Sequence, residues 1–108
     1  MRDSIISASL LSADMGCLAQ EASTVLQAGA DHLHIDVMDN HFVPNLTFGP
    51  IICRALRKHL PKAFLDVHLM VNPVDQLINA FAAAGANQIT FHPEASNDIV
   101  KNLNQIRH

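Results

Sequence analysis

The sequence lacks tryptophan and tyrosine altogether, and its 108 residues include only two cysteines and four glycines. The missing aromatic residues argue against the cages and stacking platforms that bind quaternary amines or bases. Two cysteines are too few for a disulfide scaffold, and four glycines form no glycine-rich phosphate loop. No apolar run approaches the length of about eighteen residues that a membrane span needs, so we expect none.

The sequence also has no large excess of charge of either sign. Seven Lys and Arg against ten Asp and Glu give a net charge of −3 with His neutral, which argues against nucleic acid or an anionic membrane as a partner. Arg54, Arg57 and Lys58 are expected on a solvated helix face. The N-terminus has no long apolar stretch of the signal-peptide type, and the few cysteines favour a reducing, cytoplasmic location.

Strand and helix patterns alternate along the chain. Short apolar or period-two segments predict strands, and stripes at three- and four-residue spacing predict helices. The expected strands are residues 5–10, which we expect to be buried, 32–38, 64–70 and 88–92. The expected helices lie between Asp14 and Gly29, between Gly49 and Pro61, between Asn72 and Gly85, and after Ser96 as the N-cap.

This alternation predicts an α/β fold with a parallel sheet and right-handed crossovers. Two architectures fit the pattern. One is a complete four-stranded open sheet, and the other is half of an eight-stranded barrel, which usually needs about 250 residues. Composition alone does not choose between them.

Side chains that titrate or bind metals gather late in the expected strands. His34 and Asp36 share one face of the second strand, and His68 has the matching place in the third. Because ligands of parallel α/β folds bind beyond the carboxyl ends of the strands, we expect these three side chains to meet. Two imidazoles and a carboxylate suit Zn²⁺, Fe²⁺, Mn²⁺ or Co²⁺. The competing interpretation is a set of hydrogen-bonded core residues.

Other residues near these strand ends have a structural and a functional interpretation. Met38 and Met70 follow the polar residues on the same faces, and we favour core packing over an apolar lid that keeps water from a reaction centre. His32 lies nearer the start of its strand and is expected to be structural. Residues 41–45 form either an active-site loop or a connection. The remaining polar residues on these faces are Ser7, Ser9, Asp66 and His92.

Five motifs make the chain resemble the ribulose-phosphate 3-epimerase family. They are residues 9–14 (SLLSAD), 34–39 (HIDVMD), 41–45 (HFVPN), 66–70 (DVHLM) and 91–94 (FHPE), and they keep the family's order and spacing over nearly the whole chain. The resemblance implies a (β/α)8 TIM barrel of roughly twice this length. Residues 1–108 are then the N-terminal half of a ribulose-phosphate-binding barrel, with its first four βα units. Asn40 departs from the family pattern, where Gly is usual, and so does Pro93.

The resemblance also implies an activity and roles for particular residues. The family interconverts D-ribulose 5-phosphate and D-xylulose 5-phosphate by proton transfer at C3 through an enediolate, in the pentose phosphate pathway. His34, Asp36 and His68 are implied as ligands of one divalent metal ion, zinc first, with iron, manganese or cobalt as alternatives. Asp36 is also implied as an acid/base carboxylate. The implied substrate-binding residues are Ser9, His68, Met38 and Met70.

In the family, the second acid/base Asp, which is also the fourth metal ligand, and the phosphate-binding amides belong to later strands. Residues 1–108 alone are therefore expected to be inactive. The resemblance implies a sugar phosphate as partner and a homo-oligomer in the full-length form. Three alternatives stay open: an epimerase of a six-carbon ketose phosphate from the same barrel group, two copies paired as a pseudo-barrel, and a non-catalytic half-barrel that binds metal.

Overall fold

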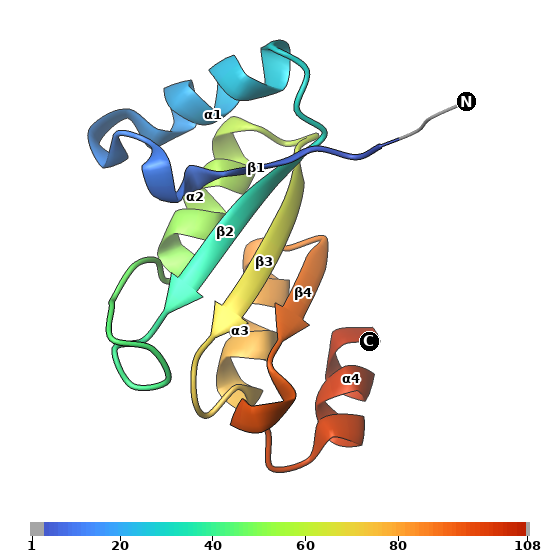
Figure 1. Ribbon diagram of the computed structural model, residues 1–108. Helices are drawn as coiled ribbons and strands as arrows, with labels where there is room; N and C mark the ends of the chain where they lie inside the picture. Colours follow the sequence, from blue (N-terminus) through green and yellow to red (C-terminus); the bar gives the residue numbers. More distant parts are fainter. Residues whose placement is uncertain (1–3, 108) are drawn as a thin grey trace.

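A computed structural model describes residues 4–107 and contains the expected alternation of strands and helices. The elements in chain order are β1 (Ser7–Ser9), α1 (Leu18–Gln27), β2 (His32–Met38), α2 (Pro50–His59), β3 (Phe64–Met70), α3 (Asp75–Ala84), β4 (Gln88–Phe91) and α4 (Ile99–Arg107). The strands form one parallel sheet in the order β1-β2-β3-β4, as Figure 1 shows. The prediction of an α/β fold is therefore confirmed.

The helices lie on one side of the sheet. In Figure 1, α2 and α3 are behind the strands, and α4 lies beside α3. Because the helices cover one side only, burial alternates along strand β2. Leu33, Ile35 and Val37 are at most 3% exposed, whereas the residues between them are only partly buried. We call the side of the sheet that carries His34, Asp36 and His68 the open face, and the opposite side the helix face.

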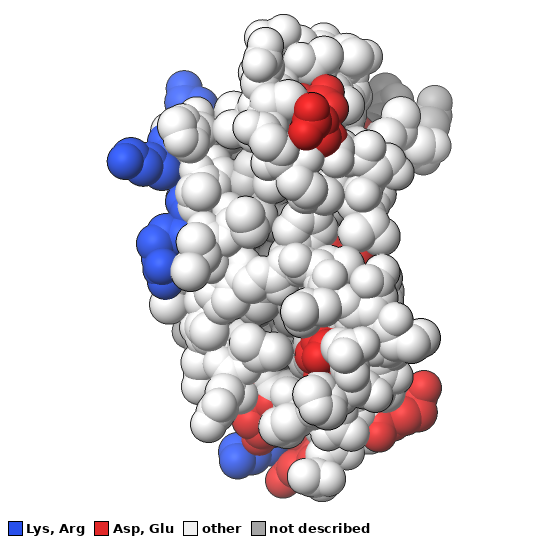
Figure 2. Space-filling view, turned by 90° about the vertical axis from the view of Figure 1, so that its left-hand side faces the viewer, with Lys and Arg blue, Asp and Glu red and all other residues white. Residues whose placement is uncertain are grey.

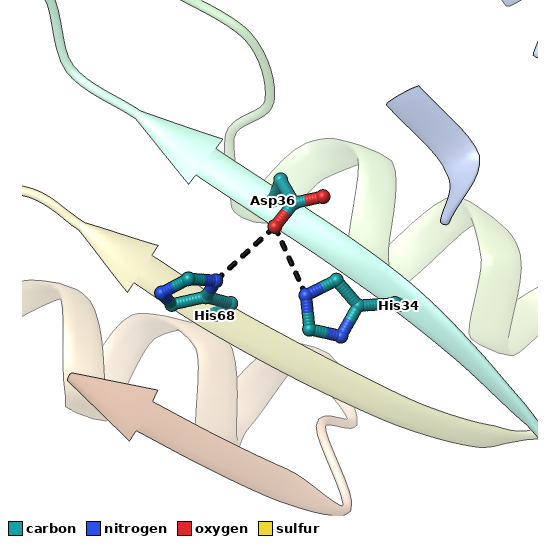
Figure 3. A group of neighbouring side chains, drawn as sticks. All are labelled: His34, Asp36 and His68. Atoms are coloured by element: carbon teal, nitrogen blue, oxygen red, sulfur yellow. Dashed lines mark hydrogen bonds and ion pairs between the residues drawn. The ribbon is translucent and has the colours of Figure 1, made fainter. Parts of the chain in front are cut away.

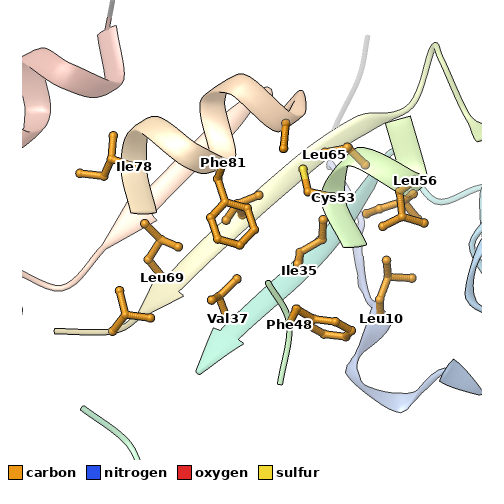
Figure 4. Close-up of a cluster of buried hydrophobic side chains, with 14 of the residues drawn as sticks. Leu10, Ile35, Val37, Phe48, Cys53, Leu56, Leu65, Leu69, Ile78 and Phe81 are labelled. Carbon is orange, nitrogen blue, oxygen red and sulfur yellow. The ribbon is translucent and has the colours of Figure 1, made fainter. Parts of the chain in front are cut away.

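The core fills the space between the helix face and the helices. Phe81 and Ile78 of α3 are fully buried among residues of β2 and β3 (Figure 4). Cys53 and Leu56 of α2 are also buried there, at no more than 1% exposure. Burying each large apolar side chain contributes about 1.5–3 kcal/mol, so this layer holds the strands in their register.

Local residue chemistry explains where several elements begin and end. Helix α2 starts with Pro50 at its first turn and ends with three basic residues, which suit the helix dipole at that end. Helix α3 stops at Gly85, whose φ of 111° favours glycine. Strands β2 and β3 have the predicted bounds.

The beginning of the chain differs from the expectation. Strand β1 covers only Ser7–Ser9, and it lies at an edge of the sheet that residues 4–107 form. Ile5 and Ile6 are each 59% exposed, so the prediction of a buried strand over residues 5–10 was wrong. The first helix starts at Leu18 because residues 15–17 form a short 3-10 turn, which Asp14 caps by accepting a hydrogen bond from the Gly16 N–H.

The last helix is capped by a different residue from the one expected. Asp98 accepts a hydrogen bond from the backbone N–H of Lys101 in the first turn of α4. Ser96 instead accepts one from the N–H of Asp98. The assignment of Ser96 as N-cap was therefore wrong, because the helix begins two residues later than that assignment assumed. Among the described residues, no helix is both long and apolar enough to cross a membrane.

Basic side chains lie mainly on the helix side of the molecule, along the left edge of Figure 2. Arg54 and Lys58 of α2 are exposed, as expected. Arg57 is not: its guanidinium donates hydrogen bonds to the carbonyl oxygens of Ala63 and Gly85, both at 2.7 Å. Its side chain thus connects the ends of α2 and α3, and the prediction that it faces only solvent was wrong.

Candidate metal centre

Three polar side chains come together on the open face. Asp36 and His68 are direct neighbours in the β2–β3 register, and His34 lies two residues before Asp36. Oδ1 of Asp36 is 2.9 Å from Nε2 of His34 and 3.2 Å from Nδ1 of His68 (Figure 3). The structure therefore confirms the expectation that these residues meet.

The donor atoms suit a divalent transition metal. One potential ligand atom from each of His34, Asp36 and His68 lies within 4.8 Å of the other two. Two imidazole nitrogens and one carboxylate oxygen are a donor set that Zn²⁺ and related ions accept. The three side chains are 27%, 14% and 23% exposed, respectively. This partial exposure leaves the group accessible to an ion from the open face.

Each of the three side chains is held by a further partner. Nδ1 of His34 lies 2.8 Å from Oδ2 of Asp66, and Nε2 of His68 lies 2.7 Å from Nε2 of His92. The Ser9 hydroxyl donates a hydrogen bond to Oδ2 of Asp36 at 3.1 Å. In each side chain, one polar atom contacts this further partner and the other points toward the rest of the cluster. The atoms that point inward are Nε2 of His34, Oδ1 of Asp36 and Nδ1 of His68.

The surroundings of His34 favour its protonated form. Burial by itself lowers the pKa of His34, but the hydrogen bonds and negative charges of Asp66 and Asp36 outweigh it and raise the pKa above the ordinary value of 6.5. Asp66 and Asp36 lie on either side of the His34 ring, and their negative charges stabilise positive charge between them. A bound metal cation would supply such positive charge.

Comparison with known proteins agrees with this geometry. Residues 5–108 match the sequence model of the ribulose-phosphate 3 epimerase family. The chain is 50% identical to ribulose-phosphate 3-epimerase of Serratia marcescens over 107 residues, which cover 99% of this chain and 51% of the relative. The Escherichia coli (strain K12) protein of the same name is 51% identical over 99% of this chain and 48% of its own length.

The chain belongs to the ribulose-phosphate 3-epimerase family. The resemblance that the five motifs carry is therefore confirmed, and the named relatives are isomerases. The chain spans about half the length of these curated relatives. Four parallel strands alternating with helices are what half of a TIM barrel contains.

The family is metal-dependent in general, and the cluster of His34, Asp36 and His68 is the group among the described residues that fits this requirement. Met38 and Met70 are neighbours in the β2–β3 register, one layer nearer the strand ends, and both are partly buried. They lie on the same face as the metal-binding group. His32 stacks on Phe64 with ring centroids 3.8 Å apart, which agrees with a structural role.

The loop after β2 is ordered by Asp39. Its Oδ1 accepts hydrogen bonds from the backbone N–H groups of His41 and Phe42, and its Oδ2 accepts one from Asn72. Asn40 has a φ of 61°, in the left-handed region that asparagine tolerates. The loop and the turn after β3 are thus joined through one carboxylate.

This loop lies beside the metal-binding group. The ring of Phe42 is 5.6 Å from that of His92 between centroids, and His92 contacts His68. Thr47 ties the other end of the loop back to β2: its hydroxyl donates to the Asp36 carbonyl and accepts from the Met38 N–H. Among the two interpretations of residues 41–45, a loop next to the site agrees better with these contacts.

Strand periodicity predicts the face of β3 on which Asp66 lies and places His92 at the end of the fourth strand, where it directly follows β4, but it predicts a partner for neither. The contacts of Asp66 with His34 and of His92 with His68 depend on the register between strands. The available signal was the two-residue spacing between Asp66 and His68 in β3, which mirrors that between His34 and Asp36 in β2.

Proposed function

We propose that this chain supplies the metal-binding half of a ribulose-phosphate 3-epimerase, which interconverts D-ribulose 5-phosphate and D-xylulose 5-phosphate in the pentose phosphate pathway. The observation that carries the proposal is the convergence of His34, Asp36 and His68 on the open face of a chain that matches this family over residues 5–108. Residues 1–108 correspond in this proposal to the N-terminal half of the barrel.

In the proposed reaction, Asp36 exchanges a proton with C3 of the sugar. The C3 proton is weakly acidic because it lies next to the C2 carbonyl, and its removal leaves an enediolate. When bound at His34, Asp36 and His68, a divalent cation supplies positive charge that stabilises this enediolate. Zinc fits the donors first, and iron, manganese and cobalt are the alternatives.

The neighbours of Asp36 have supporting roles in this proposal. The Ser9 hydroxyl donates to Oδ2 of Asp36, so it orients the carboxylate. In this proposal, Ser9 also contacts the bound sugar. His68 lies on the other side of the same carboxylate and also faces the sugar. Met38 and Met70 lie on the same face, one layer nearer the strand ends, and in this proposal their apolar side chains limit the access of water to the reacting carbon.

Inversion at C3 needs an acid on the opposite face of the sugar as well. In this proposal, that second carboxylate and the phosphate-binding groups come from residues outside 1–108, so these residues alone do not turn over the substrate. The proposed whole protein is a cytoplasmic homo-oligomer that acts on a sugar phosphate.

A chimera tests the proposal. Residues 1–108 replace the matching half of the Escherichia coli relative, with which they share 51% identity, and formation of D-xylulose 5-phosphate is followed in a coupled assay. We expect the chimera to turn over ribulose 5-phosphate and the Asp36→Asn variant to lose at least about 10³-fold in kcat. Asp75→Asn is the control, because this carboxylate lies outside the metal-binding group and makes a surface ion pair with Lys101 at 3.5 Å.

A folded chimera without turnover would contradict the proposal. Turnover of a six-carbon ketose phosphate in place of ribulose 5-phosphate would favour the alternative substrate. Binding of Zn²⁺ that depends on His34 and His68, with no epimerisation of either sugar, would favour a non-catalytic metal-binding role.

A further inference from the structure

Asp66 is a buried carboxylate for which the proposed reaction has no use. It lies on the open face of β3, directly opposite His34 in the register, and is only 6% exposed. Burying a carboxylate is costly unless hydrogen bonds compensate it. Asp66 has two such bonds, both to Oδ2: Nδ1 of His34 lies at 2.8 Å, and the Ser7 hydroxyl donates at 2.9 Å.

The contact with Asp66 favours the tautomer of His34 that a bound metal ion would require. A neutral imidazole has one N–H, and an ionised carboxylate only accepts hydrogen bonds. Without metal, both nitrogens of His34 face carboxylate oxygens: Nδ1 lies 2.8 Å from Oδ2 of Asp66, and Nε2 lies 2.9 Å from Oδ1 of Asp36. Of the two, Nε2 is the nitrogen beside the Asp36 oxygen that also lies 3.2 Å from Nδ1 of His68. A cation bound among these atoms would take the lone pair of Nε2, and the one proton of neutral His34 would then lie on Nδ1, toward Asp66.

We infer that Asp66 is a positioning residue of the metal centre: it holds the ring of His34 in the Nδ1–H tautomer, so that Nε2 is the metal-binding nitrogen, and Ser7 holds Asp66 in place. The inference rests on the proposed function, since it assumes that His34 is a metal ligand. Histidine ligands commonly donate their second N–H to a carboxylate in this way. The arrangement connects three strands, because Ser7 belongs to β1, His34 to β2 and Asp66 to β3.

His68 has a different kind of outer partner. Its Nε2 faces Nε2 of His92 at 2.7 Å, and an imidazole nitrogen either donates or accepts, depending on its tautomer. His92 can therefore pair with either tautomer of His68, whereas the Asp66 carboxylate pairs only with an Nδ1–H of His34. We therefore expect the loss of the Asp66 carboxylate to disturb the metal centre more than the loss of the His92 ring.

The test compares Zn²⁺ affinity of the purified protein with that of Asp66→Asn, by competition with a chromogenic chelator. Asparagine keeps the size of the side chain, but its amide can also donate to Nδ1 and so permits the wrong tautomer. We expect affinity to fall by about 10- to 100-fold. His32→Gln is the control, because His32 is on the same face and contacts Phe64 rather than the metal-binding group. Its affinity should equal that of the unmodified protein.

Imidazole ¹⁵N chemical shifts of the Zn²⁺-loaded protein supply a readout that a merely structural role would not move. We expect His34 to be protonated on Nδ1 and bound through Nε2 in the unmodified protein, and a mixture of the two tautomers in Asp66→Asn. Ser7→Ala, which removes only the hydroxyl donor, should weaken Zn²⁺ binding by a smaller factor. Ser7→Ala also provides the test of Asp66 if the Asp66→Asn variant does not fold.

The possible failures are distinguishable. Zn²⁺ binding that is absent, or unchanged by His34→Ala, would contradict the proposed metal centre. Binding that His34→Ala abolishes but Asp66→Asn leaves unchanged would overturn only the role of Asp66. An Nε2–H tautomer of His34 in the Zn²⁺-loaded, unmodified protein would overturn it as well, whatever the affinities.

Discussion

The two faces of strand β2 consist of alternate residues of one seven-residue segment, yet they meet opposite requirements. On the helix face, Leu33, Ile35 and Val37 are at most 3% exposed and pack in the core. On the open face, the side chains of His34 and Asp36 are 27% and 14% exposed and make hydrogen bonds to other polar groups. The first face provides stability, and the second face provides the candidate chemistry.

The comparison shows that the apolar face also determines the position of the polar one. A slip of one residue in a strand would exchange its faces, and this would bury His34 and Asp36 while exposing Ile35. Burial of the apolar residues therefore selects the register in which Asp36 lies opposite His68. Core packing thus brings the backbone positions of the metal-binding group together, and the hydrogen bonds of these side chains orient them.

Ile35→Ala has the largest expected effect on stability. The side chain is fully buried, and its truncation removes apolar contacts and leaves a cavity, so we expect a loss of about 2–5 kcal/mol in the free energy of unfolding. Urea denaturation measures this loss. Zn²⁺ affinity, measured where the variant is folded, should not change. A marked loss of affinity would show that the two faces are not independent.

His34→Ala makes the opposite change at the neighbouring position. It removes one of the three candidate metal ligands, so we expect Zn²⁺ affinity to fall by at least about 100-fold, which corresponds to about 2.7 kcal/mol. The free energy of unfolding without metal should fall by about 1–2 kcal/mol, because the buried Asp66 loses its contact with His34 but keeps the hydrogen bond from Ser7. A loss of stability as large as that of Ile35→Ala would contradict the division between the faces.

The fold was predictable where local patterns are strong. Strands β2 and β3 have their predicted bounds, because period-two alternation and apolar runs are local properties of the sequence. The exposure of Ile5 and Ile6 was not predictable, since it depends on which strands pair rather than on the residues of β1. Ser96 and Asp98 are both good N-cap residues, and only the backbone at the start of α4 distinguishes between them.

The candidate site was predictable to a similar degree. Strand periodicity placed His34, Asp36 and His68 on one face, and the structure brings them together. The contact between His34 and Asp66 was not predicted, because it joins residues 32 positions apart and depends on side-chain rotamers as well as register. Residue type and spacing thus indicate which side chains meet, but not which atoms of them do.

Asp39→Asn has a smaller effect that depends on pH. Burial by itself raises the pKa of Asp39, but backbone hydrogen bonds from Asn72, His41 and Phe42 outweigh it and lower the pKa below the usual 3.8. Since the folded pKa is the lower one, the contribution of Asp39 to stability is present above about pH 4 and is lost as the pH falls through the folded value. Core contacts such as those of Ile35 have no such dependence.

Asparagine at position 39 keeps an oxygen that can accept from the N–H groups of His41 and Phe42. It replaces the oxygen that accepts from the Asn72 N–H with an amide donor. We therefore expect Asp39→Asn to lose about 1 kcal/mol at neutral pH and to approach the unmodified protein in acid, as measured by urea denaturation over a pH series. Asn40→Gly is the control: it changes the same loop at a left-handed position without touching the carboxylate, so its small effect should be the same at every pH. A deficit of Asp39→Asn that stays constant with pH would show that the loop is held by packing, like the helix face, and not by the charge of Asp39.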